Sequence, residues 1–86
     1  MTENKKYSKN LIGKTVVTKS GKKFGTVGDI MFEIRTGELI YLLLKQPTPY
    51  ATKLELEKAK SGDIMIPFSS VIATGDFVVV AEEDIV

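Results

Sequence analysis

The chain has 86 residues, enough for one domain with a modest core, and its 43% hydrophobic and 27% charged residues are typical of a folded globular protein. It contains no Cys and no His, which excludes disulfides, thiolate metal sites and histidine acid–base chemistry. The net charge is +1, but residues 1–23 carry seven Lys against one acid, whereas residues 24–86 carry five basic and ten acidic residues.

The start of the chain is polar and basic. Lys5, Lys6 and Lys9 have no apolar stretch behind them, so no secretory signal is predicted. The longest apolar run, 39–44, is far shorter than the ~20 residues that cross a bilayer. We therefore expect a cytoplasmic protein without direct membrane insertion, beginning with a flexible basic segment, 1–10.

The first predicted strands are separated by a glycine turn. Residues 15–18 are β-branched throughout and predict a strand, and Gly21 allows the tight turn that follows. Residues 24–34 alternate like a strand, except that the phase slips at Gly28, which predicts a bulge or a sharp bend. Asp29 is expected to accept backbone N–H groups at that bend.

A second glycine turn, at Gly37, leads into a predicted strand over 39–45. Alternation gives each of its faces three apolar side chains: Leu39, Tyr41 and Leu43 on one, and Ile40, Leu42 and Leu44 on the other. A strand of a small barrel has one face outside, so the outward face needs cover from another segment or from a second copy of the protein.

The stretch 46–62 is irregular, because Pro47 and Pro49 break any strand. Thr52 and Glu55 can form a capping box that starts a short helix running to Lys60. The alternative is an edge strand in which the leucines of 54–56 alternate.

The last third of the chain predicts three short strands, over 64–66, 71–73 and 77–80. Pro67 bends the chain after the first, and Gly75 and Asp76 form the turn before the last, with Asp76 accepting turn amides. Six short strands favour an all-β fold, a strongly bent barrel over 11–81, followed by a short acidic tail, 82–86.

The residues offer no catalytic constellation. Asp29 and Glu33 would lie roughly 13 Å apart along a strand, whereas paired carboxylates of glycosidases need ~5–9.5 Å. Ser69 and Ser70 have no histidine to activate them. We expect a protein that is not an enzyme and that holds no metal or cofactor.

Five segments, taken in order, resemble the PRC-barrel domain family: LIGKTV (11–16), GKKFGTVGDI (21–30), TGELIYL (36–42), IPFSSV (66–71) and GDFVVV (75–80). The resemblance implies a short, strongly bent six-stranded β-barrel that serves as a binding module. Freestanding copies of this size resemble archaeal proteins. Some of these are dimeric cell-division adaptors bound to the SepF-type membrane anchor of the FtsZ ring.

The sequence therefore predicts a homodimeric protein–protein adaptor. The expected contact residues lie on the third and last strands: Leu39, Ile40, Leu42, Leu44, Phe77 and Val79. The alternative is a module for RNA or ribosome assembly, which would use the lysines around Tyr7; nucleic acid is the less favoured partner.

Overall fold

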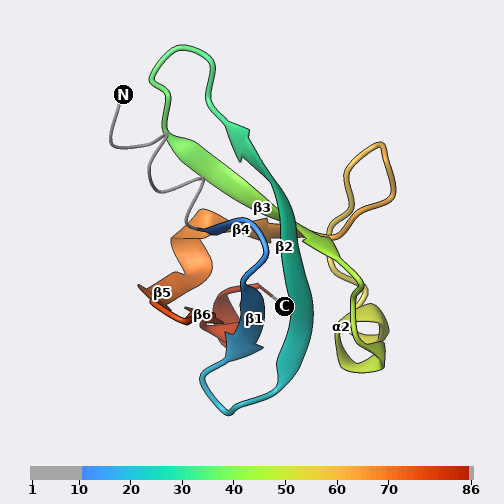
Figure 1. Ribbon diagram of the computed structural model, residues 1–86. Coiled ribbons are helices and arrows are strands. Elements are labelled where there is room, and N and C mark those ends of the chain that lie inside the picture. Colours follow the sequence, from blue (N-terminus) through green and yellow to red (C-terminus); the bar gives the residue numbers. More distant parts are fainter. Residues whose placement is uncertain (1–10, 86) are drawn as a thin grey trace.

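Strands form where β-branched and aromatic residues cluster, and the turns between them carry glycines. The computed structural model describes residues 11–85 (Figure 1). Its strands are β1 (Thr15–Thr18), β2 (Lys23–Phe32), β3 (Leu39–Lys45), β4 (Met65–Pro67), β5 (Val71–Thr74) and β6 (Phe77–Val80). A short helix, α2 (Pro49–Lys53), and two 3-10 turns, η1 (Phe68–Ser70) and η2 (Glu82–Asp84), complete the described part. The predicted six-stranded, all-β architecture is confirmed.

The six strands form one sheet in the order β4-β3-β2-β1-β6-β5. β1 and β6 are parallel, and the other neighbours are antiparallel. The two edge strands, β4 and β5, are connected directly by the three residues of η1. Because so short a link joins both edges, the sheet must bend back on itself. β4 and β5 do not pair with each other, and η1 spans the gap between them.

Hydrogen bonds hold η1 in place. The Ser70 hydroxyl donates to the Pro67 carbonyl at 2.6 Å, and the Ala81 N–H donates to the Ser70 carbonyl at 2.8 Å. Ser70 is fully buried, so its hydroxyl has a structural role in this turn. This turn is the seam of the barrel.

The predicted turns are confirmed at Gly21 and Gly37, which have φ of 90° and 73°. Both values lie in the left-handed region that glycine adopts without steric cost. Gly75 also lies in a turn, but it is not in this region. The side chain of Asp76 makes no hydrogen bond to another residue of 11–85, so the prediction that it accepts turn amides is wrong.

The predicted bulge at Gly28 is confirmed. Val27 pairs with Leu44 and Asp29 pairs with Leu43, so Gly28 is an extra residue on β2. A Cβ at Gly28 would lie 1.9 Å from the Lys45 Cγ, because the lysine side chain crosses the strand there. Asp29 accepts a hydrogen bond from the Ile30 backbone N–H at 2.8 Å, as predicted.

The lysine that crosses Gly28 ends in an ion pair. The Asp63 carboxylate accepts hydrogen bonds from Lys45 Nζ at 2.9 Å and from the Ser61 hydroxyl at 3.2 Å. The Lys45 bond is the main cause that holds the pKa of Asp63 below its ordinary value of 3.8. Since the folded pKa is the lower one, the pair stabilises the fold above that value and loses its contribution as pH falls through the folded pKa.

Asp63→Asn is therefore expected to melt at a lower temperature than the wild type at pH 7, with the difference shrinking as the pH falls below 3.8 and through the lowered pKa of Asp63. Circular dichroism melts across this range measure the effect, which is small because the ion pair is partly exposed. Asp76→Asn is the matched control and should change nothing at either pH. A loss at Asp63→Asn that persists unchanged in acid would contradict the assignment.

The core lies inside the bend of the sheet. Its largest fully buried side chain is Phe24, whose ring centroid lies 5.8 Å from that of Tyr50. The buried cluster consists of Leu11, Val16, Phe24, Val27, Leu42, Leu44, Ala51, Leu56, Ile64, Ile66, Val78 and Val80.

The helix in 46–62 is shorter and begins earlier than predicted. Its N-cap is Thr48, whose hydroxyl accepts the Ala51 N–H at 3.3 Å, and Pro49 occupies the first turn, where its missing N–H costs nothing. The predicted start at Thr52 is wrong, because Glu55 has φ of 52° and ends the helical path. The edge-strand alternative is also not observed over 54–56.

The predicted acidic tail packs onto the barrel over 82–85. Lys19 Nζ lies 2.5 Å from the Glu83 carboxylate, the Tyr50 hydroxyl donates to Glu82, and Ile85 packs against the core. The domain therefore continues beyond the predicted boundary at 81. The predicted flexible segment 1–10 lies outside the described residues.

Candidate functional site

The structure divides the predicted contact residues into buried and accessible groups. Leu42 and Leu44 are 0% and 1% exposed and belong to the core, so they are not available to a partner and were wrongly assigned to the contact. Leu39 and Val79 are half-buried. Ile40 and Phe77 are exposed.

The outward face of β3 is mostly covered by its own chain. Leu43 lies outside the main core cluster, yet only 8% of it is exposed. It pairs with Met65 of β4, which is also buried. Of the two kinds of cover expected, the protein's own chain and not a second copy covers Leu42 to Leu44, and only the beginning of β3 keeps accessible apolar groups.

Accessible apolar side chains gather instead where β2 ends and β3 begins. This hairpin extends from the rest of the described domain (Figure 1). Its exposed members, which we call the hairpin patch, are Met31, Phe32, Ile34 and Ile40. Ile34, at the turn, is 97% exposed. Exposed aliphatic groups in such a cluster are typical of interaction surfaces.

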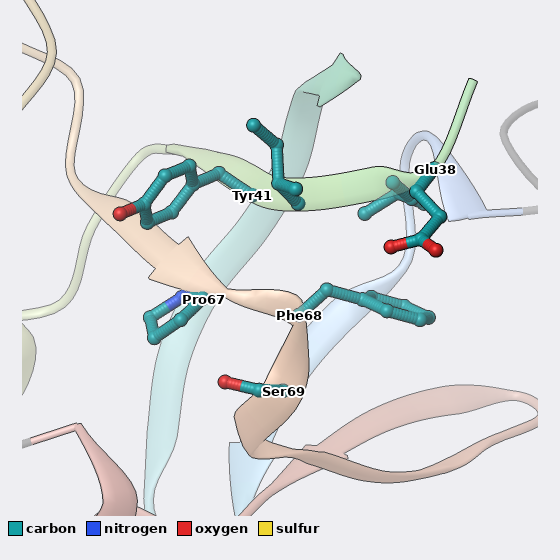
Figure 2. Close-up of a pocket in the computed structure, with 7 residues that line it drawn as sticks. Glu38, Tyr41, Pro67, Phe68 and Ser69 are labelled. Atoms are coloured by element: carbon teal, nitrogen blue, oxygen red, sulfur yellow. The ribbon is translucent and has the colours of Figure 1, made fainter. Parts of the chain in front are cut away.

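Beside the hairpin patch lies an open hollow with a volume of about 550 Å³ (Figure 2). Its lining residues are Glu38, Leu39, Ile40, Tyr41, Pro67, Phe68 and Ser69. Tyr41 and Pro67 lie at one end, and the Glu38 carboxylate faces the Phe68 ring at the other. The volume is within the range of ~300–1,000 Å³ that is usual for binding pockets.

The hollow exists because β4 is shorter than β3 and leaves the first residues of β3 unpaired on that side. Pairing between them stops at Tyr41 and Pro67, since proline has no N–H to extend the ladder and the chain turns into η1. No strand of residues 11–85 pairs with β3 at Leu39 and Ile40 on that side. The seam of the barrel thus leaves a short stretch of sheet edge open beside an apolar wall.

Glu38 is the one charged residue that lines the hollow. Its carboxylate makes no ion pair or hydrogen bond with another residue of 11–85. The two ion pairs of the described chain, at Lys19 and Lys45, involve other acids. Tyr41 directs its hydroxyl out of the hollow towards the Glu57 carboxylate, at 3.5 Å. The hollow is therefore lined by both apolar and polar groups, with an unpaired carboxylate at its rim.

Residues 11–85 contain neither a membrane-spanning helix nor a metal-binding group of acidic side chains. No helix there has the length and apolar character to span a membrane. No three acidic side chains in the same region converge closely enough to hold a metal ion.

Six short strands, a sheet whose edges meet at one 3-10 turn, and the bend at Pro67 agree with the resemblance drawn from the sequence. The family model of the PRC-barrel domain matches residues 3–84, nearly the whole chain. The chain belongs to the PRC-barrel domain family. A comparison with curated proteins found no match.

Sequence reasoning missed the most exposed parts of this PRC-barrel domain. Alternation placed Phe32 and Ile34 on the same face as Ile30, but only Ile30 packs against the core, because the hairpin continues beyond it. A second bulge, at Ile40, pairs Leu39 with Phe32 and shifts the predicted faces of β3. The signal for the hollow was present in Pro67, which limits β4 to three residues.

Proposed function

We propose that this PRC-barrel domain is a cytoplasmic, non-catalytic adaptor that acts as a homodimer, with the hairpin patch at the contact between copies. The observation that carries the proposal is that four exposed large apolar residues lie on one hairpin, at the end of β2, in the turn and at the start of β3. A second exposed pair, Ile72 and Phe77, lies on β5 and β6. The hairpin patch is the larger, and two-fold pairing would bury it against itself.

The partner that we propose for the dimer is a SepF-type anchor of the archaeal cell-division machinery. The support is the resemblance of the sequence to archaeal PRC-barrel proteins that act in that way. Membership of the family by itself supports the coarser role, a small interaction module.

Ile34→Asp is expected to convert the dimer into a monomer that still folds, because the side chain is 97% exposed in the single chain. Each copy loses roughly 1.5–3 kcal/mol of apolar burial. A two-fold contact contains Ile34 from both copies, so the loss of burial occurs twice. The dissociation constant of the dimer should therefore rise by about a hundredfold or more. Light scattering on the eluting protein measures the mass, with the 9.5 kDa chain as the monomer reference.

Phe77→Asp is the matched control, since it places the same charge on another exposed apolar residue. It should leave the dimer intact. If it dissociates the dimer while Ile34→Asp does not, the contact lies at β6. A wild-type protein that stays monomeric at micromolar concentration would remove the homodimer from the proposal.

The RNA hypothesis depends on Lys5, Lys6, Tyr7 and Lys9, which lie outside the described residues. Within the described part, Lys19 is paired with Glu83. RNA binding therefore gains no support from the structure and stays the alternative.

A further inference from the structure

We propose that the hollow at the barrel seam binds an extended peptide of a partner protein by strand addition along β3. An apolar side chain of the peptide occupies the hollow, and a lysine or arginine beside it pairs with Glu38. The proposal rests on the role as a protein-interaction module and not on the homodimer. It assigns the partner site to a surface that adjoins the hairpin patch and shares Ile40 with it.

The first support is the open sheet edge. An exposed edge offers unpaired backbone groups to an incoming strand, and strand addition is a common way to bind an extended peptide. At Leu39 and Ile40 the edge is available because Pro67 ends β4 one pair earlier. The hydrogen bonds of Ser70 to Pro67 and Ala81 keep η1 from moving across it.

The second support is the wall beside this edge. Phe68 is half-buried and packs against the core, so its ring is held in place by the barrel. Together with Leu39 and Pro67 it gives the hollow an apolar lining directly below the open edge (Figure 2). A strand that pairs with β3 would direct alternate side chains towards this wall.

The third support is charge complementarity at the rim. The Glu38 carboxylate has no hydrogen bond or ion pair with another residue of 11–85, and no cation of that range lines the hollow. A basic residue next to the apolar anchor satisfies this carboxylate. A second copy fits less well, because the open edge spans only the beginning of β3 and offers too little area for a contact of ~800 Å² per partner.

The test is an NMR titration of the ¹⁵N-labelled full chain with the peptide Lys-Val-Lys-Leu-Lys-Val-Lys. A second peptide, with glutamate at every lysine position, serves as the matched probe. We expect the lysine peptide to shift the amide signals of Leu39, Ile40, Tyr41, Phe68 and Ser69. The glutamate peptide should bind about fivefold more weakly, as for the loss of one exposed ion pair.

Two variants test the role of the charge. Glu38→Lys should reverse the preference, so that the glutamate peptide becomes the tighter ligand. Asp76→Lys makes the same change in net charge on an exposed turn and should leave the preference as it is. If both variants change the preference equally, the attraction is general rather than local, and the proposal fails.

Backbone methylation tests strand addition. Methylating the peptide nitrogens one at a time should weaken binding at every second position, because the N–H groups of a strand alternate between its two edges. Equal effects at all positions would overturn the strand geometry. Binding that appears only after Lys5, Lys6 and Lys9 are all changed to glutamate would assign the hollow to the protein's own N-terminal segment and overturn the partner proposal.

The peptide and dimer experiments fail independently. A dimer whose hollow signals ignore the peptide overturns the peptide site and leaves the homodimer standing. A monomer that binds the lysine peptide at the hollow does the reverse.

Discussion

Replacing Phe24 by alanine is expected to lower the free energy of unfolding by about 3–5 kcal/mol. Phe24 is the largest of the fully buried side chains, and its ring meets that of Tyr50 at a tilt of 34°. Truncation removes both the apolar burial and the aromatic contact, and it leaves a cavity that the surrounding strands fill only in part. Because a chain of this length has a total stability of roughly 4–13 kcal/mol, the variant should lose between about a quarter and all of it.

Urea denaturation followed by circular dichroism measures this loss. Phe77→Ala is the matched control, since it removes the same atoms from a side chain that is 53% exposed. It should cost less than about 1 kcal/mol. Similar losses at the two positions would mean that Phe24 does not occupy the centre of the core.

Gly25→Ala is expected to cost about 2–4 kcal/mol, from backbone strain and overpacking together. Gly25 has φ of 155°, which side-chain-bearing residues rarely adopt. A Cβ there would lie 3.1 Å from the Lys45 carbonyl oxygen and 3.2 Å from the Pro47 Cα. These are backbone atoms, which cannot rotate away as a side chain can.

The close approach at Gly25 matters because it attaches α2 to the sheet. Immediately beside it, the Thr48 N–H donates to the Phe24 carbonyl at 2.8 Å, and the Thr48 hydroxyl donates to the Lys23 carbonyl at 2.5 Å. A methyl group at residue 25 would separate β2 from this segment. We therefore expect the N-cap of α2 to lose protection against amide hydrogen exchange.

Substitutions at two other glycines distinguish the cost of backbone strain from the cost of steric crowding. Gly21 has φ of 90° with open space around it, so Gly21→Ala should cost only the conformational term, about 1–2 kcal/mol. Gly75 has neither constraint, and Gly75→Ala should be nearly neutral. The expected order of loss in denaturant unfolding is Gly25, Gly21, Gly75. Equal losses at Gly25 and Gly21 would show that crowding contributes nothing.

Phe24→Ala and Gly25→Ala act on the folded core and lie away from the two proposed binding surfaces. The hairpin patch and the hollow consist of residues that lie outside the core or at its margin, such as Ile34 and Glu38. Variants at those positions should alter association while the single chain still folds. This separation allows the binding proposals to be tested in proteins that remain folded.

Local patterns in the sequence determined the elements of this fold. Runs of β-branched residues located β1 and β6, a run of apolar residues located β3, and the glycines at 21 and 37 located turns, because backbone preference acts within a few residues. The slip in alternation at Gly28 located a bulge for the same reason. Family membership also followed from short ordered segments, and the match over 3–84 confirmed it.

Tertiary structure decided which apolar side chains are accessible. Leu42, Leu43 and Leu44 look alike in the sequence, and all are buried because other parts of the chain cover both faces of β3. Ile34 is as hydrophobic as they are and stays exposed, because the hairpin continues past the barrel. Burial depends on which distant segments meet, and the alternation of a single strand carries no information about that. The hollow has the same origin, since it forms only where η1 brings the edges of the sheet together.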